Sequence, residues 1–180
     1  MPIFPAADPA GRLYFAWKGE GLRMNVEQPL KRILGWDDIT RLVDKLAAQL
    51  DGQDFDAMLV VTRGGMVPAG LLSEALDIRN ILVAAVQFYT GIGTTLEHPR
   101  FLQFPDASLL EGSSILVVDD VWDSGRTAAE VRERIRSVGG NPLLAVLHYK
   151  PRASRYPDQQ PDFHAEVTED WIVYPWDSDH

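Results

Sequence analysis

Residues 115–127 read ILVVDDVWDSGRT, and this stretch decides which fold the sequence predicts. Its first four residues are apolar and predict a buried strand, which ends at Asp119 and Asp120. Residues 123–127 (DSGRT) then form a turn that opens a helix. Paired carboxylates at a strand end can accept hydrogen bonds from vicinal sugar hydroxyls, and turn N–H groups with a helix N-terminus can surround a phosphate. The residues alone also allow a simpler reading, in which the aspartates cap the helix and Gly125 permits a tight turn.

Strands and helices alternate on both sides of this stretch. Apolar spacing predicts helices over 36–50, from the 62–65 turn to about 76, and from the 123–127 turn to 138, with buried strands over 55–61, 81–88, 114–119 and 142–148. Such alternation predicts an α/β fold with a mostly parallel central sheet flanked by helices. Ligands of such sheets bind at the carboxyl ends of the strands, where the turns of interest begin.

Two further connections follow predicted strands. The first is Thr62-Arg63-Gly64-Gly65, whose paired glycines let backbone approach an anion closely, although a tight turn with a solvated arginine is the default interpretation. The second is the long polar stretch 89–112, which predicts a functional or disordered loop. Residues 1–35 hold four prolines and predict an N-terminal extension with little regular structure, followed by a single domain over 36–180.

Composition excludes several classes of protein. There is no cysteine, which removes thiol nucleophiles, disulfides and thiolate metal sites and fits a cytoplasmic protein. The net charge is -9, from 26 acidic and 17 basic residues, so nonspecific binding of nucleic acid is not expected. No apolar run is long enough to cross a membrane. A phosphate ligand would therefore have to be held by local groups.

The complete string 115–127 resembles the binding motif for phosphoribosyl pyrophosphate (PRPP) in the type I phosphoribosyltransferases: four apolar residues, two acidic residues, a short spacer, then Asp-Ser/Thr-Gly-x-Thr. Trp122 is bulkier than the aliphatic residue usual in the spacer. By this resemblance Asp119 and Asp120 hold the ribose hydroxyls, residues 123–127 hold the 5′-phosphate, and the 62–65 turn is the pyrophosphate loop. The PRPP-binding residues implied are Thr62, Arg63, Gly64, Gly65, Asp119, Asp120, Asp123, Ser124, Gly125, Arg126 and Thr127.

The C-terminal segment 171–177 (WIVYPWD) resembles the xanthine-guanine and hypoxanthine-guanine branch of that family. In this branch a lysine after the fourth strand contacts the 6-oxo group and an aromatic residue stacks on the purine, which implies purine-binding roles for Lys150, Trp171 and Ile172. A planar base gains stacking on a tryptophan, and a cationic donor favours an oxo over an amino substituent. The simpler alternatives are edge-strand packing for the tryptophan and a solvated strand end for the lysine.

The resemblance implies a purine-salvage enzyme that transfers the phosphoribosyl group of PRPP to a 6-oxopurine and releases pyrophosphate and a purine nucleotide. It implies Mg²⁺ as cofactor, with Asp119, Asp120 and Asp177 as candidate ligands. It also implies that Asp123 lies beside the imidazole ring of the purine and is the candidate general base or hydrogen-bond acceptor for the N7 proton. It also implies a small hood from the C-terminal segment, a mobile loop after residue 88 that brings Tyr89, Thr90 and Arg100 toward pyrophosphate, and a homodimer or homotetramer.

Two alternatives remain open. One is a phosphoribosyltransferase for another base, although an orotate enzyme usually carries a lysine-rich mobile loop and residues 89–112 contain only Arg100 as a basic residue. The other is a PRPP-sensing regulator without catalysis. Such a regulator would be expected to carry a basic face or an appended DNA-binding element, which a net charge of -9 and a short extension do not favour.

Overall fold

The computed structural model of the chain describes residues 30–87 and 100–177 in full. Four short strands outside these ranges are described by their backbone alone: β1 (Pro5–Ala7) pairs antiparallel with β2 (Leu13–Phe15), and β6 (Thr90–Gly91) with β7 (Thr94–Thr95). Tyr89 and the side chain of Thr90, both expected at the pyrophosphate, lie outside the described residues.

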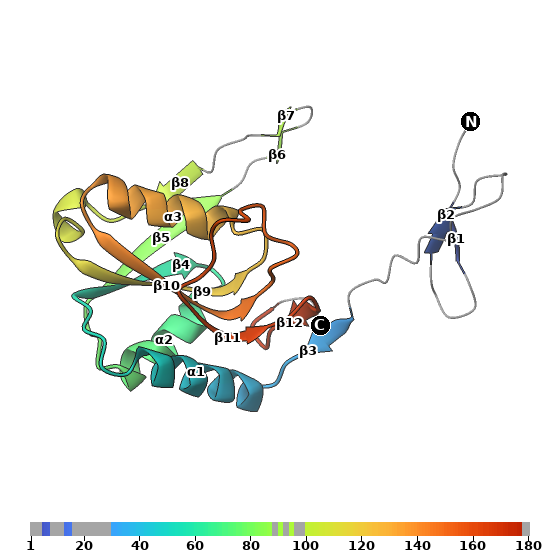
Figure 1. Cartoon of the computed structure of the whole chain (residues 1–180), viewed down its shortest axis with the longest axis horizontal. Helices are drawn as coiled ribbons and strands as arrows, with labels where there is room; N and C mark the ends of the chain where they lie inside the picture. The colour runs from blue at the N-terminus through green and yellow to red at the C-terminus, as the bar shows by residue number, and fades with distance from the viewer. Residues whose placement is uncertain are drawn as a thin grey trace.

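A six-stranded sheet forms the centre of the molecule (Figure 1). Its strands lie in the order β11-β10-β9-β4-β5-β8, and all neighbours are parallel except β5 and β8. The bounds are β4 Ala57–Thr62, β5 Ile81–Gln87, β8 Arg100–Gln103, β9 Ser114–Trp122, β10 Asn141–Tyr149 and β11 Phe163–Val167. The predicted α/β fold with a mostly parallel sheet is confirmed.

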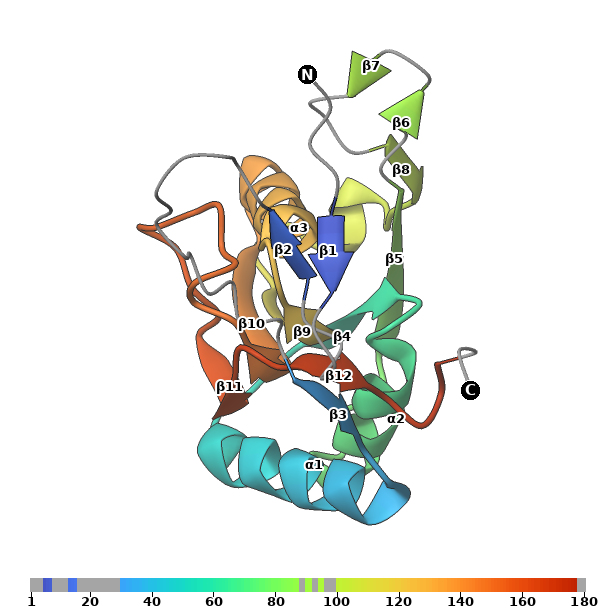
Figure 2. The ribbon, with the colours of Figure 1, turned by 90° about the vertical axis from the view of Figure 1, so that its right-hand side faces the viewer.

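Helices cover both faces of the sheet, so the middle portions of the central strands are continuous apolar runs. Helices α1 (Trp36–Leu50) and α2 (Met66–Ala75) lie on one face and α3 (Arg126–Ser137) lies on the other (Figure 2). The sheet thus separates two apolar cores: Leu46 and Leu72 lie in the first with Val118, and Val131 and Ile135 lie in the second with Val117. Alternate residues of β9 face opposite cores, which fixes the direction of each side chain at its carboxyl end.

A two-stranded parallel sheet lies beside the main one, where β3 (Lys31–Ile33) pairs with β12 (Trp171–Val173). The Arg32 guanidinium on β3 also forms an ion pair with the Glu166 carboxylate on β11. β3 falls in the range where little regular structure was predicted. The three residues are too few to show a period, and they are ordered by strands that follow much later in the chain.

The expectation that residues 89–112 form one long loop is wrong for their second half. Strand β8 adds antiparallel to β5 at the sheet edge, and the 3₁₀ helix η1 (Ala107–Leu109) follows it. The Arg134 guanidinium of α3 lies 4.4 Å from the ring centroid of Phe101 and 4.6 Å from that of Phe104, which holds this segment against the domain. The sequence signal was weak because an edge strand alternates little between buried and exposed positions.

No helix in the described part of the chain has the length and apolar character that crossing a membrane would require.

Candidate active site

The loops that carry the candidate residues meet at one edge of the sheet. Strands β4, β9 and β10 are parallel neighbours, with Val60 opposite Val118 and Asp119 opposite Val146. Their carboxyl ends therefore lie side by side, and the loops that follow them converge there. This is the edge at which ligands of parallel α/β sheets bind.

Asp119 and Asp120 lie at this edge with little access to solvent. Asp119 is 9% exposed, and its Oδ1 accepts a hydrogen bond of 2.9 Å from the Asp120 N–H. Burial raises the pKa of the Asp119 carboxyl well above its ordinary value, and the neighbouring Asp120 charge raises it further. Burial likewise raises the pKa of Asp120 to about 6, with the negative charge of Asp177 adding to the effect. The site thus disfavours the ionised form of both carboxyls, and a bound hydrogen-bond donor or cation would reduce that cost.

The 62–65 turn packs directly on the end of β9. A Cβ atom added to Gly64 would overlap the Asp120 carboxylate, and one added to Gly65 would overlap the carbonyl oxygens of Val118 and Val61. The Thr62–Arg63 peptide bond is cis, and α2 begins directly after Gly65. Two segments that sequence analysis assigned to different parts of one ligand are therefore in contact.

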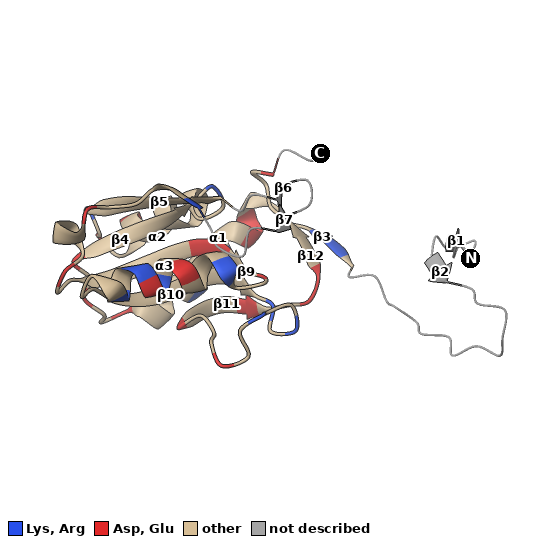
Figure 3. Ribbon diagram, turned by 90° about the horizontal axis from the view of Figure 1, so that it is seen from above, with Lys and Arg blue, Asp and Glu red and all other residues tan. Residues whose placement is uncertain are grey.

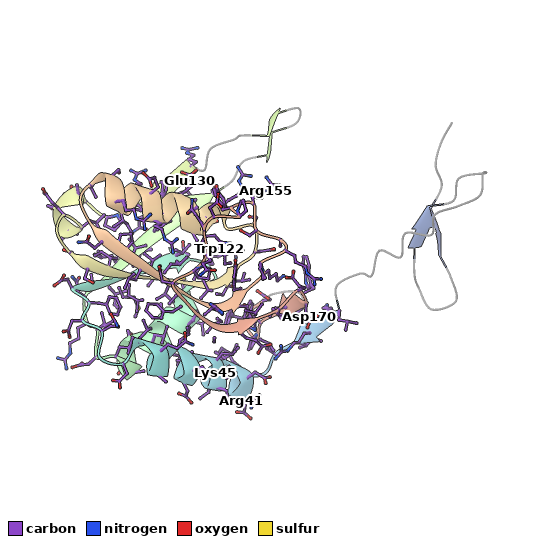
Figure 4. The ribbon with its side chains drawn as sticks, in the orientation of Figure 1. Arg41, Lys45, Trp122, Glu130, Arg155 and Asp170 are labelled. Atoms are coloured by element: carbon purple, nitrogen blue, oxygen red, sulfur yellow. The ribbon has the colours of Figure 1, made fainter. Side chains whose placement is uncertain are left out.

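The 123–127 turn rests on the indole of Trp122. This side chain is completely buried beneath the N-terminal end of α3 (Figure 4). Gly125 has φ of +76°, and a Cβ atom there would overlap the Trp122 ring. Trp122, the bulky residue in the spacer, thus supports the turn. Only glycine fits at position 125, because the backbone there has a positive φ and because the indole lies directly below it. Helix α3 begins directly after this turn, at Arg126, and a helix N-terminus of this kind suits an anion.

The segment 150–155, of which the sequence predicted a role only for Lys150, holds this turn from the other side. The N–H of Lys150 donates to the Trp122 carbonyl (2.9 Å), and the N–H of Arg155 donates to the Ser124 carbonyl (3.0 Å). The Trp122 indole N–H donates to Ser154 Oγ at 3.1 Å. Figure 4 shows Arg155 near the start of α3. These bonds have no sequence signature, because backbone carbonyls accept from any residue.

Of the three residues predicted to bind a purine, Lys150 directly follows β10, and Trp171 and Ile172 lie on β12. The Lys150 Nζ is 6.0 Å from the centroid of the Trp171 ring, which is 61% exposed and so offers a free face. Ile172 is half-buried against the first core. The structure thus places Lys150 close to Trp171, and the purine-binding roles of all three residues stay predictions.

Asp177 is held close to the carboxylate pair by a turn. Its Oδ2 accepts a hydrogen bond of 2.8 Å from the Tyr174 N–H, and its own N–H donates to the Tyr174 carbonyl at 3.0 Å. Asp123 is exposed at the start of the turn, Arg63 is exposed in the 62–65 turn, and Arg100 begins β8 opposite Gln87. Sequence analysis missed Tyr174, although it lies within the quoted 171–177 segment.

Comparison with known proteins agrees with this geometry. Residues 30–180 match the phosphoribosyl transferase domain family. The xanthine-guanine phosphoribosyltransferase of Roseobacter denitrificans is 36% identical over 154 residues, which are 80% of this chain and 84% of that protein.

Two solved structures are similar in fold and sequence. A purine phosphoribosyltransferase from Pyrococcus horikoshii superposes with a TM-score of 0.71 at 35% identity, covering 82% of this chain and 94% of that one. A protein from Neisseria gonorrhoeae with bound ppGpp also has a TM-score of 0.71, at 29% identity, covering 84% of this chain and 91% of that one. The residues matched by the family, 30–180, include all of the candidate site.

Replacing Asp120 by asparagine is expected to stabilise the unliganded protein at neutral and higher pH. The folded-state pKa of about 6 lies above the ordinary 3.8, so protonation of this carboxyl favours folding below about pH 4 and that stabilisation is lost as pH rises through 6. The neutral amide avoids burying a charge, which is worth on the order of 2 kcal/mol at pH 8.

Urea unfolding of wild type and Asp120→Asn at pH 4 and pH 8 measures this difference. The gain in unfolding free energy should be larger at pH 8 than at pH 4. The matched control is Asp44→Asn, at an exposed position of α1, which should show no such gain. A gain of equal size at both pH values would contradict the raised pKa.

Proposed function

The chain belongs to the phosphoribosyltransferase family, and on that premise we propose that it transfers the 5-phosphoribosyl group of PRPP to a 6-oxopurine, releasing pyrophosphate and a purine nucleoside monophosphate. The observation that carries the proposal is the contact between Gly64 and the Asp120 carboxylate. This contact supports the proposal because it joins the turn assigned to pyrophosphate and the carboxylate pair assigned to the ribose hydroxyls. PRPP has that same arrangement of pyrophosphate next to ribose hydroxyls.

The donor is held by three neighbouring elements. Asp119 and Asp120 accept hydrogen bonds from the ribose hydroxyls, and the backbone N–H groups of residues 123–127 at the start of α3 receive the 5′-phosphate. The 62–65 turn, with the Arg63 guanidinium and the Gly64 amide, receives the pyrophosphate. Local dipoles and a few cations thus hold three phosphoryl groups in a protein whose net charge is -9.

The carboxylate pair also stabilises the reacting centre. As the bond to pyrophosphate breaks, positive charge develops at the anomeric carbon, and ionised carboxylates fixed in a site of low polarity lower the energy of that state. The purine imidazole nitrogen then attacks from the opposite side and forms the new glycosidic bond. Asp123, at the mouth of the same turn, accepts the proton that the imidazole ring loses.

The acceptor is held by the hood and by the end of β10. A purine stacks on the exposed face of Trp171, while the Lys150 ammonium donates to its 6-oxo group. The backbone of Ile172 contacts the opposite edge of the base. A cationic donor at this position selects against adenine, whose 6-amino group is itself a donor.

The residues at the site fit a magnesium ion. Asp119, Asp120 and Asp177 offer carboxylate oxygens, the ligands that Mg²⁺ prefers. Burial, together with the neighbouring charge of Asp120 on Asp119 and of Asp177 on Asp120, raises the pKa values of Asp119 and Asp120, and a cation at this place would relieve that cost. Within residues 30–87 and 100–177, no cluster of three or more His, Asp or Glu side chains forms a ready-made metal site. Substrate oxygens and water would therefore complete the coordination, and the bound ion would neutralise charge on the departing pyrophosphate.

The charge distribution favours an enzyme over a nucleic-acid-binding regulator. Acidic and basic residues are interspersed along α3 instead of forming one basic face (Figure 3). The relative from N. gonorrhoeae has ppGpp bound, which supports binding of purine nucleotides by this fold. Assembly into a homodimer or homotetramer, and a cytoplasmic location, stay predictions.

The direct test supplies the purified protein with magnesium, PRPP and, separately, hypoxanthine, xanthine, guanine or adenine. Pyrophosphate release is expected with at least one oxopurine and not with adenine. Converting both Asp119 and Asp120 to asparagine should lower turnover by about three orders of magnitude or more, because the developing charge loses both carboxylates. Circular dichroism should show the variant folded. Near-normal turnover by that variant would contradict the roles proposed for Asp119 and Asp120 in phosphoribosyl transfer.

A single methyl group at Gly64 should also abolish most activity. Gly64→Ala forces the Asp120 carboxylate away from its position, and a displacement of that size costs about a hundredfold in kcat/KM for PRPP. Gly70→Ala on α2 is the matched control, because a Cβ atom there meets nothing within 4 Å. The control should keep full activity and gain about 0.5–1 kcal/mol of stability. Equal activity in both variants would show that the Gly64 contact has no functional role.

Lys150→Ala should separate the acceptor from the donor. Loss of a charged hydrogen bond to the base lowers kcat/KM for the oxopurine about 10- to 100-fold. PRPP binding, measured by calorimetry with magnesium, should change by less than about twofold because no donor contact is removed. Lys45→Ala on α1 is the exposed control (Figure 4). Parallel losses for both substrates would indicate that Lys150 is structural.

A further inference from the structure

The phenol of Tyr174 connects the hood to the carboxylate pair. Its side chain is 4% exposed, and its Oη lies 3.1 Å from the backbone carbonyl oxygen of Asp120 on β9. The same oxygen lies 2.8 Å from Nδ1 of His148 on β10. Three elements that are far apart in the sequence thus meet at one hydroxyl group.

The positions of the protons in this group follow from its chemistry. A backbone carbonyl can only accept, so the single Tyr174 hydroxyl proton is donated to Asp120. The Tyr174 oxygen then accepts, which requires a proton on His148 Nδ1. Burial lowers the pKa of His148 to about 4, so the ring is neutral at pH 7 and its Nε2 carries the lone pair. His148 Nε2 has no partner in the described part of the chain, which agrees with a ring whose orientation is set by Nδ1 alone.

Packing keeps the Tyr174 ring from changing its orientation. The ring stacks on Trp176, with centroids 4.7 Å apart and an interplanar angle of 9°. Trp176 in turn packs against Trp36 at the start of α1, with centroids 6.2 Å apart. Because the Tyr174 ring is buried and stacked on Trp176, its hydroxyl is held at one place before any ligand arrives.

We infer that Tyr174, oriented by His148, is a positioning residue for the carboxylate of Asp120. The hydrogen bond from the Tyr174 hydroxyl fixes the orientation of the Asp120 carbonyl group. The backbone at Asp120 is fixed with it, and this determines the direction in which the carboxylate projects toward the Gly64 turn. The inference rests on the proposed function, since it assigns Asp120 to the donor. It adds a residue that contacts neither substrate. Tyr174 belongs to the 171–177 segment, which is assigned to the purine, yet it acts on Asp120, which is assigned to PRPP.

The test removes hydroxyl and imidazole separately and together. Tyr174→Phe keeps the stacked ring and loses only the bond to Asp120, so kcat/KM for PRPP should fall about tenfold. The KM for the oxopurine should change by less than about twofold, because Lys150 and Trp171 are untouched. A merely structural role in holding the hood would instead raise the oxopurine KM.

Two further variants separate the roles. His148→Leu should lower kcat/KM for PRPP as well, and adding it to Tyr174→Phe should cause no further loss, since both act through one hydrogen bond. His148→Asn places an amide donor near the position of Nδ1 and should recover at least half of the activity. Tyr149→Phe is the matched control, because that ring lies against Trp122 and His164 and its hydroxyl is not part of this group.

Failure of the inference is distinct from failure of the proposed function. If the wild type releases no pyrophosphate with any oxopurine, the function fails, and the inference is then decided by calorimetric PRPP affinity, which Tyr174→Phe should lower about tenfold and Tyr149→Phe should not. Nitrogen NMR of the wild type should also show the His148 proton on Nδ1. Unchanged PRPP kinetics or affinity in Tyr174→Phe, additive losses in the double variant, or a proton on Nε2 would each overturn the inference.

Discussion

The close approach of the 62–65 turn to the end of β9 is the constraint on which the site depends. Gly64 has no room for a side chain because the Asp120 carboxylate fills that space, and Gly65 lies against the carbonyl oxygens of two parallel strands. This approach needs β4 next to β9, both ending at the same edge, and therefore needs the strand order of the whole sheet. The alternation of strands and helices therefore does more than form the two apolar cores, because it also brings the 62–65 turn and the Asp120 carboxylate into contact.

The same site opposes the stability of the fold. Two adjacent carboxyl groups are withdrawn from water, and this burial raises both pKa values above the ordinary value. The surrounding strands, buried on both faces, hold the pair in place against this cost. A ligand that supplies hydroxyl donors or a cation removes the penalty when it binds, so part of its affinity comes from relieving the empty site.

Local sequence patterns predicted the elements at the centre of the molecule. They did not predict the elements that are held by contacts with residues far away in the sequence. The apolar run before Asp119 and the period of α3 needed only neighbouring residues, so β9, α3 and the two glycine turns could be placed correctly. Strands β3 and β8 exist because of partners elsewhere in the chain, and no local signal marks them. In the sequence Trp122 departs from the motif, and the structure explains this because its buried indole supports the 123–127 turn. The Tyr174 and His148 bond follows no spacing rule.

The pairing of β3 with β12 has a consequence for the smallest working form of the protein. Residues 31–33 come before the first helix, yet they complete the sheet that carries Trp171 and Ile172. A fragment that starts at Met24 retains this strand, whereas one that starts at Trp36 leaves the edge of β12 open and removes the partner of Glu166. The N-terminal limit for trimming or fusing this protein is therefore set by a backbone ladder, and the limit lies before residue 31.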